Sequence, residues 1–219
     1  MAVVRWNRLY TLGVGLVALA CGDGGGGTQP PGPPTDLFIS GGNGQSWYFN
    51  NPLPLALSVT AKDASGRAVS GVVVTWALTS GTGAVRPTQS TTDANGIATT
   101  IDSIGSSTLQ TVGATFTGLA SAASFTEAAT TPPTSAAVDV KDNFFSPQNV
   151  VMQTGGTVTW TWQGAAVHNI TYTGGPMPLP ADGPNQTTGT FSSTITVVGK
   201  YTYVCTNHAG MTGSITVVH

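Results

Sequence analysis

Residues 205–211 of the chain read Cys-Thr-Asn-His-Ala-Gly-Met. A thiol, an imidazole and a thioether therefore follow one another at regular spacing, at Cys205, His208 and Met211. Alternating apolar residues before this segment (201–204) and after it (215–218) predict two antiparallel strands joined by a short loop. We therefore expect three side chains that can bind a metal ion on one hairpin loop, close enough to converge on a single ion.

The types of these side chains favour one metal over another. Zinc takes four strong nitrogen, sulfur or oxygen ligands, and a thioether is a poor ligand for it. Cysteine, histidine and a weakly bound methionine are instead the ligands of a trigonal copper site that transfers electrons, and such a site needs a second histidine. The chain has three histidines, His168, His208 and His219. The residues alone leave open which of the other two joins His208.

A second motif precedes the loop. The strand pattern Gly-x-x-Val-x-Trp of residues 155–160 is followed by His168-Asn169-Ile170, and then by Tyr-x-Tyr-x-Cys-x-x-His-x-x-Met from Tyr201. This order, spread over residues 135–219, resembles the cupredoxins, the small blue copper proteins of the plastocyanin, amicyanin and halocyanin kind. The resemblance implies a Greek-key β-sandwich that binds one type 1 copper. It makes His168, Cys205 and His208 the equatorial ligands and Met211 the axial ligand.

The same resemblance assigns roles to neighbouring residues. It implies that Asn169 ties the ligand loop together with Thr206 as its partner, and that the carbonyl of Val167 approaches copper opposite Met211. It makes His208 the surface port for electrons. We expect an apolar rim around this port from Ala209 and Gly210, with residues 177–180 as a weaker addition.

Two departures from the plastocyanin pattern matter for docking. Val204 stands directly before the cysteine, where an exposed tyrosine would serve as a second port, so we expect no such port. The carboxylates of this segment are few and form no acidic run. They are Asp139, Asp142 and Asp182. We therefore predict that docking to a redox partner relies on apolar contact and depends little on salt.

The first 20 residues resemble a secretory signal, because Arg5 and Arg8 precede an apolar run that is about half of the ~20 residues needed to span a bilayer. Cys21 follows in a context that resembles a bacterial lipobox, which predicts a lipidated N-terminus; ordinary cleavage near Ala20 is the alternative. Residues 21–35 are rich in glycine and proline and predict a disordered tether. If Cys21 carries lipid, Cys205 is an unpaired thiol in an oxidising compartment, where metal ligation would protect it; a disulfide between the two is the alternative.

Residues 36–129 predict a separate β-sandwich. Short alternating strands are punctuated by turn signals, and Trp76 is expected in the core. Segments such as residues 61–72 and 92–98 resemble bacterial immunoglobulin-like (Ig-like) repeats of invasin-type surface proteins. This resemblance implies a spacer or presentation module. Its carboxylates Asp63, Asp93 and Asp102 are expected in or beside turns, with a calcium site as the less favoured alternative. Residues 130–135 predict a Thr/Pro linker, so the chain is expected to be all-β, with a second sandwich over residues 136–219.

Composition narrows the function further. Only 7% of the residues are charged and the formal net charge is −2, so no basic patch exists for nucleic acid. We expect an exported, monomeric electron-transfer protein, lipid-anchored in the periplasm or at the cell surface, without enzymatic activity or a small-molecule substrate. Its partners would be a redox donor and acceptor, such as a cytochrome or an oxidase or reductase. A copper-delivery protein and a surface adhesion protein are the alternatives.

Overall fold

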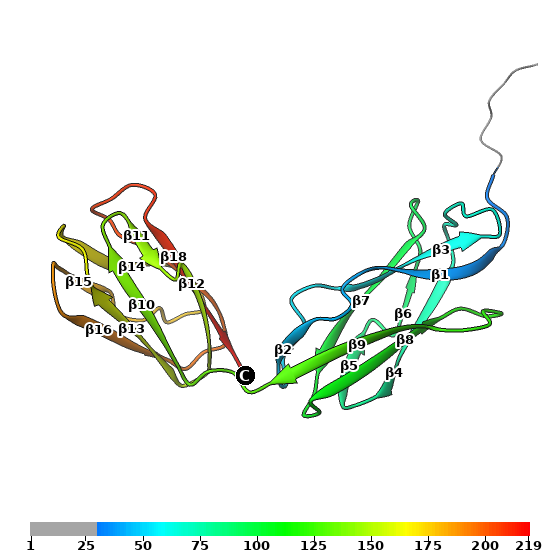
Figure 1. The fold of residues 1–219 in the computed structure, drawn as a ribbon, viewed down its shortest axis with the longest axis horizontal. Helices are drawn as coiled ribbons and strands as arrows, with labels where there is room; N and C mark the ends of the chain where they lie inside the picture. The colour runs from blue at the N-terminus through cyan, green and yellow to red at the C-terminus, as the bar shows by residue number, and fades with distance from the viewer. Residues whose placement is uncertain (1–29) are drawn as a thin grey trace, which may run out of the picture. The chain divides into compact units, whose positions relative to one another are not determined.

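The structure is a computed structural model that describes residues 30–219. Within that range every regular element is a β-strand, and the strands form four sheets (Figure 1). The predicted all-β fold is therefore confirmed. The expected signal segment, Cys21 and most of the expected tether lie outside the described residues. In the part of the chain that is described, no helix has the length and apolar character needed to cross a membrane.

The first sandwich pairs two sheets, with strand orders β1-β3-β7-β5 and β2-β9-β8-β4-β6. The strands are β1 (Pro34–Gly41), β2 (Ser46–Tyr48), β3 (Leu57–Asp63), β4 (Val73–Ser80), β5 (Gly83–Arg86), β6 (Gln89–Thr91), β7 (Ile97–Ile104), β8 (Leu109–Thr115) and β9 (Ala123–Thr130). The first strand starts before the expected boundary at Asp36. The backbone N–H of Gly32 already donates to Asp63 Oδ2 at 2.8 Å, so the last residues of the expected tether belong to the folded unit.

The core of the first sandwich follows the alternation of its strands. Leu57, Val59 and Ala61 of β3 are fully buried, and the residues between them are half-buried. Trp76 is 1% exposed and its ring lies 5.9 Å from that of Phe125, which confirms its predicted place in the core. This packing is what an alternating sequence produces when one face of each sheet is covered by the other.

The carboxylates of the first sandwich divide into two kinds. Asp63 and Asp93 accept backbone N–H groups of the turns that follow them, as predicted. The prediction for Asp102 is wrong: this residue is fully buried within β7, where it contacts the side-chain amide of Gln110. Glu127 of β9, which the sequence reasoning overlooked, is 1% exposed and pairs in register with Gln110. Polar side chains therefore occupy inward positions that the alternation alone assigns to the core.

The second sandwich carries the metal-binding motifs. Its sheets have strand orders β11-β10-β13-β16 and β12-β18-β17-β14-β15. The strands are β10 (Ser135–Lys141), β11 (Phe144–Ser146), β12 (Asn149–Gln153), β13 (Gly156–Trp162), β14 (His168–Gly174), β15 (Gly183–Gln186), β16 (Thr190–Ile195), β17 (Gly199–Val204) and β18 (Thr212–Val218). The parallel pair β10 with β13 has an antiparallel pair on either side, and the parallel pair β12 with β18, at the edge of its sheet, continues into the antiparallel pair β18 with β17.

Aromatic rings fill the space between these two sheets. Val158, Trp160 and Trp162 of β13 are 0%, 0% and 5% exposed, so both tryptophans pack in the core. The ring of Trp160 lies edge-on to Tyr203 at 5.4 Å and stacks on Phe191 at 5.6 Å. Because aromatic pairs in these orientations pack densely and resist rearrangement, the strands that end at the metal-binding motifs are held in a rigid frame.

Candidate metal centre

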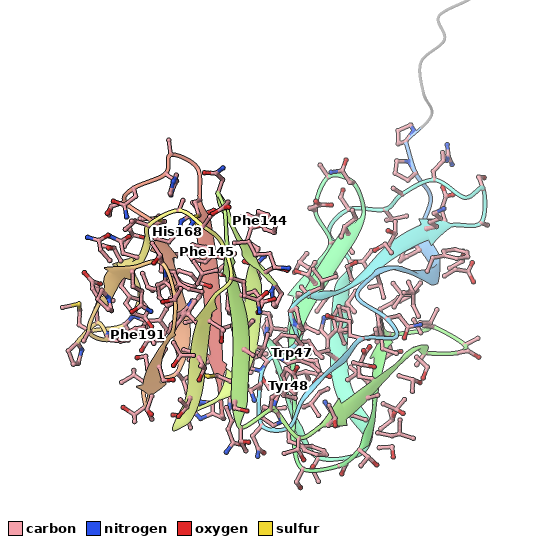
Figure 2. The ribbon with its side chains drawn as sticks, turned by 60° about the vertical axis from the view of Figure 1, so that its left-hand side comes forward. Trp47, Tyr48, Phe144, Phe145, His168 and Phe191 are labelled. Carbon is pink, nitrogen blue, oxygen red and sulfur yellow. The ribbon has the colours of Figure 1, made fainter. Side chains whose placement is uncertain are left out.

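The strand pairing brings the predicted ligands to one end of the second sandwich. His168 is the first residue of β14, and Cys205 directly follows the last residue of β17. These strands pair with Thr171 opposite Val204, so the start of one lies beside the end of the other. His208 and Met211 belong to the loop that joins β17 to β18. Figure 2 shows His168 at the same end of the second sandwich as Phe144 and Phe145.

Three of the four predicted ligands converge on one point. Cys205 Sγ lies 3.7 Å from Nδ1 of His168 and 3.6 Å from Nδ1 of His208. All three ligand atoms lie within 4.8 Å of one another. Metal–sulfur and metal–nitrogen bonds of about 2.3 and 2.0 Å span about 3.5–3.7 Å when they meet at an angle between tetrahedral and trigonal. The three atoms are therefore spaced as ligands of one ion.

Burial differs among the predicted ligands in a way that matters for access. His168, Cys205 and Met211 are 0%, 3% and 1% exposed, whereas His208 is half-buried. Met211 belongs to the same hydrophobic cluster as Cys205, which places its thioether in the core beneath the loop. His208 is therefore the most accessible of the four predicted ligands.

The loop that carries the ligands is closed by its own backbone. The N–H of Cys205 donates to the carbonyl of Met211 at 3.0 Å, while longer bonds of 3.4 Å run from His208 to Cys205 and from Met211 to His208. Gly210 has φ of 81°, a left-handed conformation that glycine adopts without strain. The chain therefore turns tightly enough to direct both ends of the loop toward the same centre.

Asn169 and Thr206 form the predicted tie between the two ligand segments. Asn169 Nδ2 donates to Thr206 Oγ1 at 2.7 Å, and the backbone N–H of Thr206 donates to Asn169 Oδ1 at 2.9 Å. Because each residue directly follows a predicted ligand, these two bonds fix the spacing between the histidine strand and the cysteine loop.

The carbonyl of Val167 has a partner in the same loop. It accepts a hydrogen bond from Asn207 Nδ2 at 3.3 Å, and Asn207 also reaches Asn185 at 2.8 Å. The next carbonyl, that of His168, accepts the indole N–H of Trp162 at 3.2 Å. The approach of the Val167 carbonyl to a metal opposite Met211 remains a prediction.

Asp142 is a neighbour of this centre that the sequence reasoning did not single out. Its Oδ1 lies 3.3 Å from Nε2 of His168, the ring nitrogen that faces away from Cys205. The backbone N–H groups of Ala166 and Ala165, and then His168, hold the pKa of Asp142 below its ordinary value. The carboxyl group is therefore ionised at neutral pH. No pattern in the sequence marks this residue, because it lies in a turn far from its partner along the chain.

The surface around His208 differs in part from the expected rim. Ala209 and Gly210 are exposed as predicted, and Val167 is 47% exposed. The assignment of residues 177–180 to the rim is wrong, because Pro178, Leu179 and Pro180 line a pocket with Tyr201 and Val197, at the end of β17 away from Cys205. Phe144, 53% exposed, lies instead on this surface, in a hollow that it shares with Gly210 and Met211.

The tyrosines that precede the cysteine are enclosed in the core. Tyr201 and Tyr203 are 1% and 0% exposed, so neither ring reaches the surface. Burial raises the pKa of Tyr203 to about 12. A ring that holds its proton this firmly, away from water, is a packing element of the site's frame.

The chemistry of the donor set fits copper. Two imidazole nitrogens and one sulfur converge, and a buried methionine supplies a weak thioether rather than the fourth strong ligand that zinc requires. The Cys205 thiol forms no disulfide within the described residues. The arrangement can therefore hold one copper ion in a closed, largely dry pocket with a single histidine edge toward the surface.

Comparison with known proteins points the same way. Residues 134–218 match the copper binding proteins of the plastocyanin/azurin family. Amicyanin-alpha of Methylorubrum extorquens is 32% identical over 88 residues, which cover 39% of this chain and 74% of the relative. A solved purple cupredoxin from Nitrosopumilus maritimus is 28% identical, covering 38% of this chain and 99% of that chain with a TM-score of 0.35. A reduced mutant of amicyanin is 30% identical, with 38% and 82% covered and a TM-score of 0.35.

Proposed function

The chain belongs, through residues 134–218, to the plastocyanin/azurin family of copper-binding proteins, and on that premise we propose that it is an electron-transfer protein with one type 1 copper. We assign His168, Cys205 and His208 as the equatorial ligands and Met211 as the axial ligand. One observation carries the proposal: the sulfur and the two imidazole nitrogens already converge at 3.6–3.7 Å. When bound, copper supplies a one-electron couple between Cu(II) and Cu(I).

The protein's contribution is to keep the ligand positions unchanged while the charge changes. Three of the four assigned side chains are buried against aromatic packing, and the ligand loop is bonded to itself and to Asn169. A frame of this kind leaves little room for reorganisation, which favours rapid electron transfer. It also argues against a copper-delivery protein, since delivery requires open, exchangeable ligands. The proposal assigns no catalytic reaction to the chain.

We assign the surface around His208 as the place where electrons enter and leave. His208 is half-buried, its neighbour Ala209 is exposed, and the exposed Phe144 shares a hollow with Gly210 of the same loop, so an apolar partner surface can approach the imidazole. The partners would be a redox donor and an acceptor, such as a cytochrome or an oxidase or reductase. We propose that the protein acts as a monomer.

The proposed location rests on the sequence of the N-terminal segment. Its signal-like run and Cys21 support an exported protein that is lipid-anchored in the periplasm or at the cell surface. The first sandwich would then serve as a spacer between the anchor and the copper domain, as its resemblance to Ig-like surface repeats suggests. Mass spectrometry of the protein from membranes tests the anchor, because a diacylated Cys21 adds a defined mass to the N-terminal peptide.

Absorption and EPR spectroscopy of the Cu(II)-loaded chain, purified from Thr28 onward, test the copper function. We expect an intense visible band and a narrow copper hyperfine splitting, bleached reversibly by a reductant. Cys205→Ser, His168→Gln and His208→Gln should each abolish this signal. His219→Gln is the matched control, since it removes the third histidine and should leave the spectrum unchanged. A wild-type protein with only a weak, broad Cu(II) signal would overturn the proposal.

A further inference from the structure

The turn between β10 and β11 places a carboxylate against the most deeply buried predicted ligand. Asp142 Oδ1 lies 3.3 Å from Nε2 of His168, whose side chain is 0% exposed. The two residues are 26 positions apart: Asp142 lies in the turn between two strands of one sheet, and His168 lies in β14 of the other sheet. The contact therefore comes from the fold and not from neighbouring positions in the chain.

The loop before His168 holds this carboxylate in place. The backbone N–H groups of Ala165 and Ala166 donate to Oδ2 and Oδ1 of Asp142 at 3.3 and 3.0 Å. Gly164 leaves the space that the carboxylate fills, since a Cβ at this position would lie directly against Asp142 Oδ1. One side chain thus joins the β10–β11 turn, the loop before β14 and the imidazole of His168.

The orientation of the ring determines what this contact can do. Nδ1 of His168 faces Cys205 Sγ at 3.7 Å, so a metal ligated at this centre requires a free lone pair on Nδ1. The ring proton then resides on Nε2, from which it donates to Asp142. A carboxylate acceptor fixes the tautomer and the ring orientation of a ligand histidine and makes it a stronger electron donor. A fixed negative charge near the ion also favours Cu(II) over Cu(I).

We propose that Asp142 is a positioning residue for the copper site: it locks His168 in the tautomer that ligates through Nδ1 and lowers the reduction potential of the bound copper. This inference rests on the proposed function for its effect on potential. Its effect on the ring does not, because the contact between the carboxylate and Nε2 involves protein atoms alone.

The matched pair of variants is Asp142→Asn and Asp139→Asn. Both remove one carboxylate from the same hairpin, but Asp139 pairs with Lys141 at 3.7 Å and with Gln163 at 3.0 Å, and touches no predicted ligand. Outer partners of metal ligands typically change metal affinity by about 10–100-fold. We expect Asp142→Asn to raise the ratio of reduced to oxidised copper roughly tenfold at a fixed electrode potential, which is about 59 mV for one electron. Asp139→Asn should change the ratio less than about twofold by the same arithmetic.

Nitrogen-15 NMR of the copper-free protein provides the second measurement. The wild type should show His168 as the Nε2–H tautomer with a slowly exchanging ring proton, and Asp142→Asn should show a mixture of both tautomers. Gly164→Ala is a further variant that retains the charge but takes the space of the carboxylate. It should disturb the tautomer while leaving the net charge unchanged, and its thermal unfolding shows whether it has folded.

The outcomes separate the two proposals. Equal potentials in Asp142→Asn and Asp139→Asn, together with an unchanged His168 tautomer, would overturn the role of Asp142 and leave the copper function standing. A wild-type protein without an intense visible band would overturn the copper function. The NMR measurement on the copper-free protein would still decide whether Asp142 fixes the ring.

Discussion

Asn169 is the residue on which the alignment of the two ligand segments depends. We predict that Asn169→Ala lowers the free energy of unfolding of the second sandwich by about 1–3 kcal/mol, because it removes two hydrogen bonds that each contribute about 1 kcal/mol. Both bonds go to Thr206, at 2.7 and 2.9 Å. Copper should also dissociate faster, since the cysteine loop loses its tie to the histidine strand. Chemical denaturation of the copper-free protein and loss of the visible band in a chelator measure the two effects.

Asn207→Ala is the control for this change. Asn207 lies in the same loop and also bonds through its side-chain amide, but it is exposed and bonds only to Asn185 and Val167. Exposed substitutions of this kind usually alter stability by less than about 0.5 kcal/mol. Equal losses in the two variants would contradict the special role of Asn169.

Among single residues, the sequence predicts a convergent set of metal-binding side chains but does not predict the contacts of two aspartates. The spacing of Cys205, His208 and Met211 placed three functional groups on one loop, and spacing is a local property that the chain displays directly. Asp142 and Asp102 carry no such pattern. Asp142 meets its partner, His168, only because the strands on either side pair with distant segments. The preference of aspartate for turns predicts a turn for Asp102, but this residue lies within β7 at a position that faces the core.

At the scale of elements, the pairing of β17 with β18 depends on a glycine. Gly213 lies opposite Tyr203, and a Cβ at this position would lie 2.6 Å from the tyrosine hydroxyl and 2.7 Å from a ring carbon. Tyr203 is fully buried and cannot move aside. We predict that Gly213→Ala costs about 1–3 kcal/mol in the free energy of unfolding, as overpacking of a core does. Denaturant unfolding of the copper-free protein measures the cost.

Gly174→Ala is the matched control in the same sheet. A Cβ there would meet only the side-chain hydroxyl of Thr202, at 3.1 Å, and that group is exposed and held only by a surface hydrogen bond to the Thr173 hydroxyl at 3.0 Å. We expect a loss of less than about 0.5 kcal/mol. If Gly174→Ala proved as costly as Gly213→Ala, the cost would come from placing any side chain at a strand glycine. The contact with Tyr203 would then not explain the result.

Long strands were predictable as elements because their alternation repeats several times. Thus β13 and β17 matched the expected patterns, with their inward residues buried. Strands of three residues, such as β2 and β11, offer too few positions to show a period. The position of a loop is equally hard to predict, as residues 177–180 show. Their composition indicates a loop, but which end of the sandwich the loop covers depends on pairing between distant strands.

At the scale of the whole molecule, the scarcity of charge limits how a redox partner can be recognised. The chain has seven basic and nine acidic residues in 219, and exposed apolar side chains such as Val167 and Phe144 lie near His208. We predict that the bimolecular rate of electron transfer changes less than about threefold between 20 and 300 mM salt, because steering by charge is weak. Stopped-flow reduction by a partner cytochrome measures the rate. A steep decline with salt would contradict apolar docking.

The first sandwich has a different sensitivity, to pH, because it encloses two carboxyl groups. Asp102 and Glu127 are 0% and 1% exposed, and within residues 30–219 neither Asp102 Oδ2 nor Glu127 Oε1 has a hydrogen-bond partner. Burial raises the pKa of Asp102. Burial also raises the pKa of Glu127, to about 7, and the nearby charge of Asp102 contributes to this rise. The other oxygen of each group accepts one hydrogen bond, from the Gln110 amide for Asp102 and from the N–H of Gln45 for Glu127. Burial of a carboxylate with only one oxygen paired is costly, so the protein favours the protonated acid at Glu127.

The pH dependence of unfolding follows from this burial. Between the ordinary pKa of 4.5 and the folded value of about 7, the folded sandwich holds a proton that the unfolded chain has lost, so its free energy of unfolding falls as pH rises through this window and levels off above it. At about 1.4 kcal/mol per unit, the loss is roughly 3 kcal/mol. Calorimetry from pH 4 to 8 measures it. Glu127→Gln should remove most of the dependence, whereas the exposed Asp36→Asn should not. A melting temperature of the first sandwich that rises from pH 5 to 7 would contradict this account, and so would a Glu127→Gln variant with the wild-type slope.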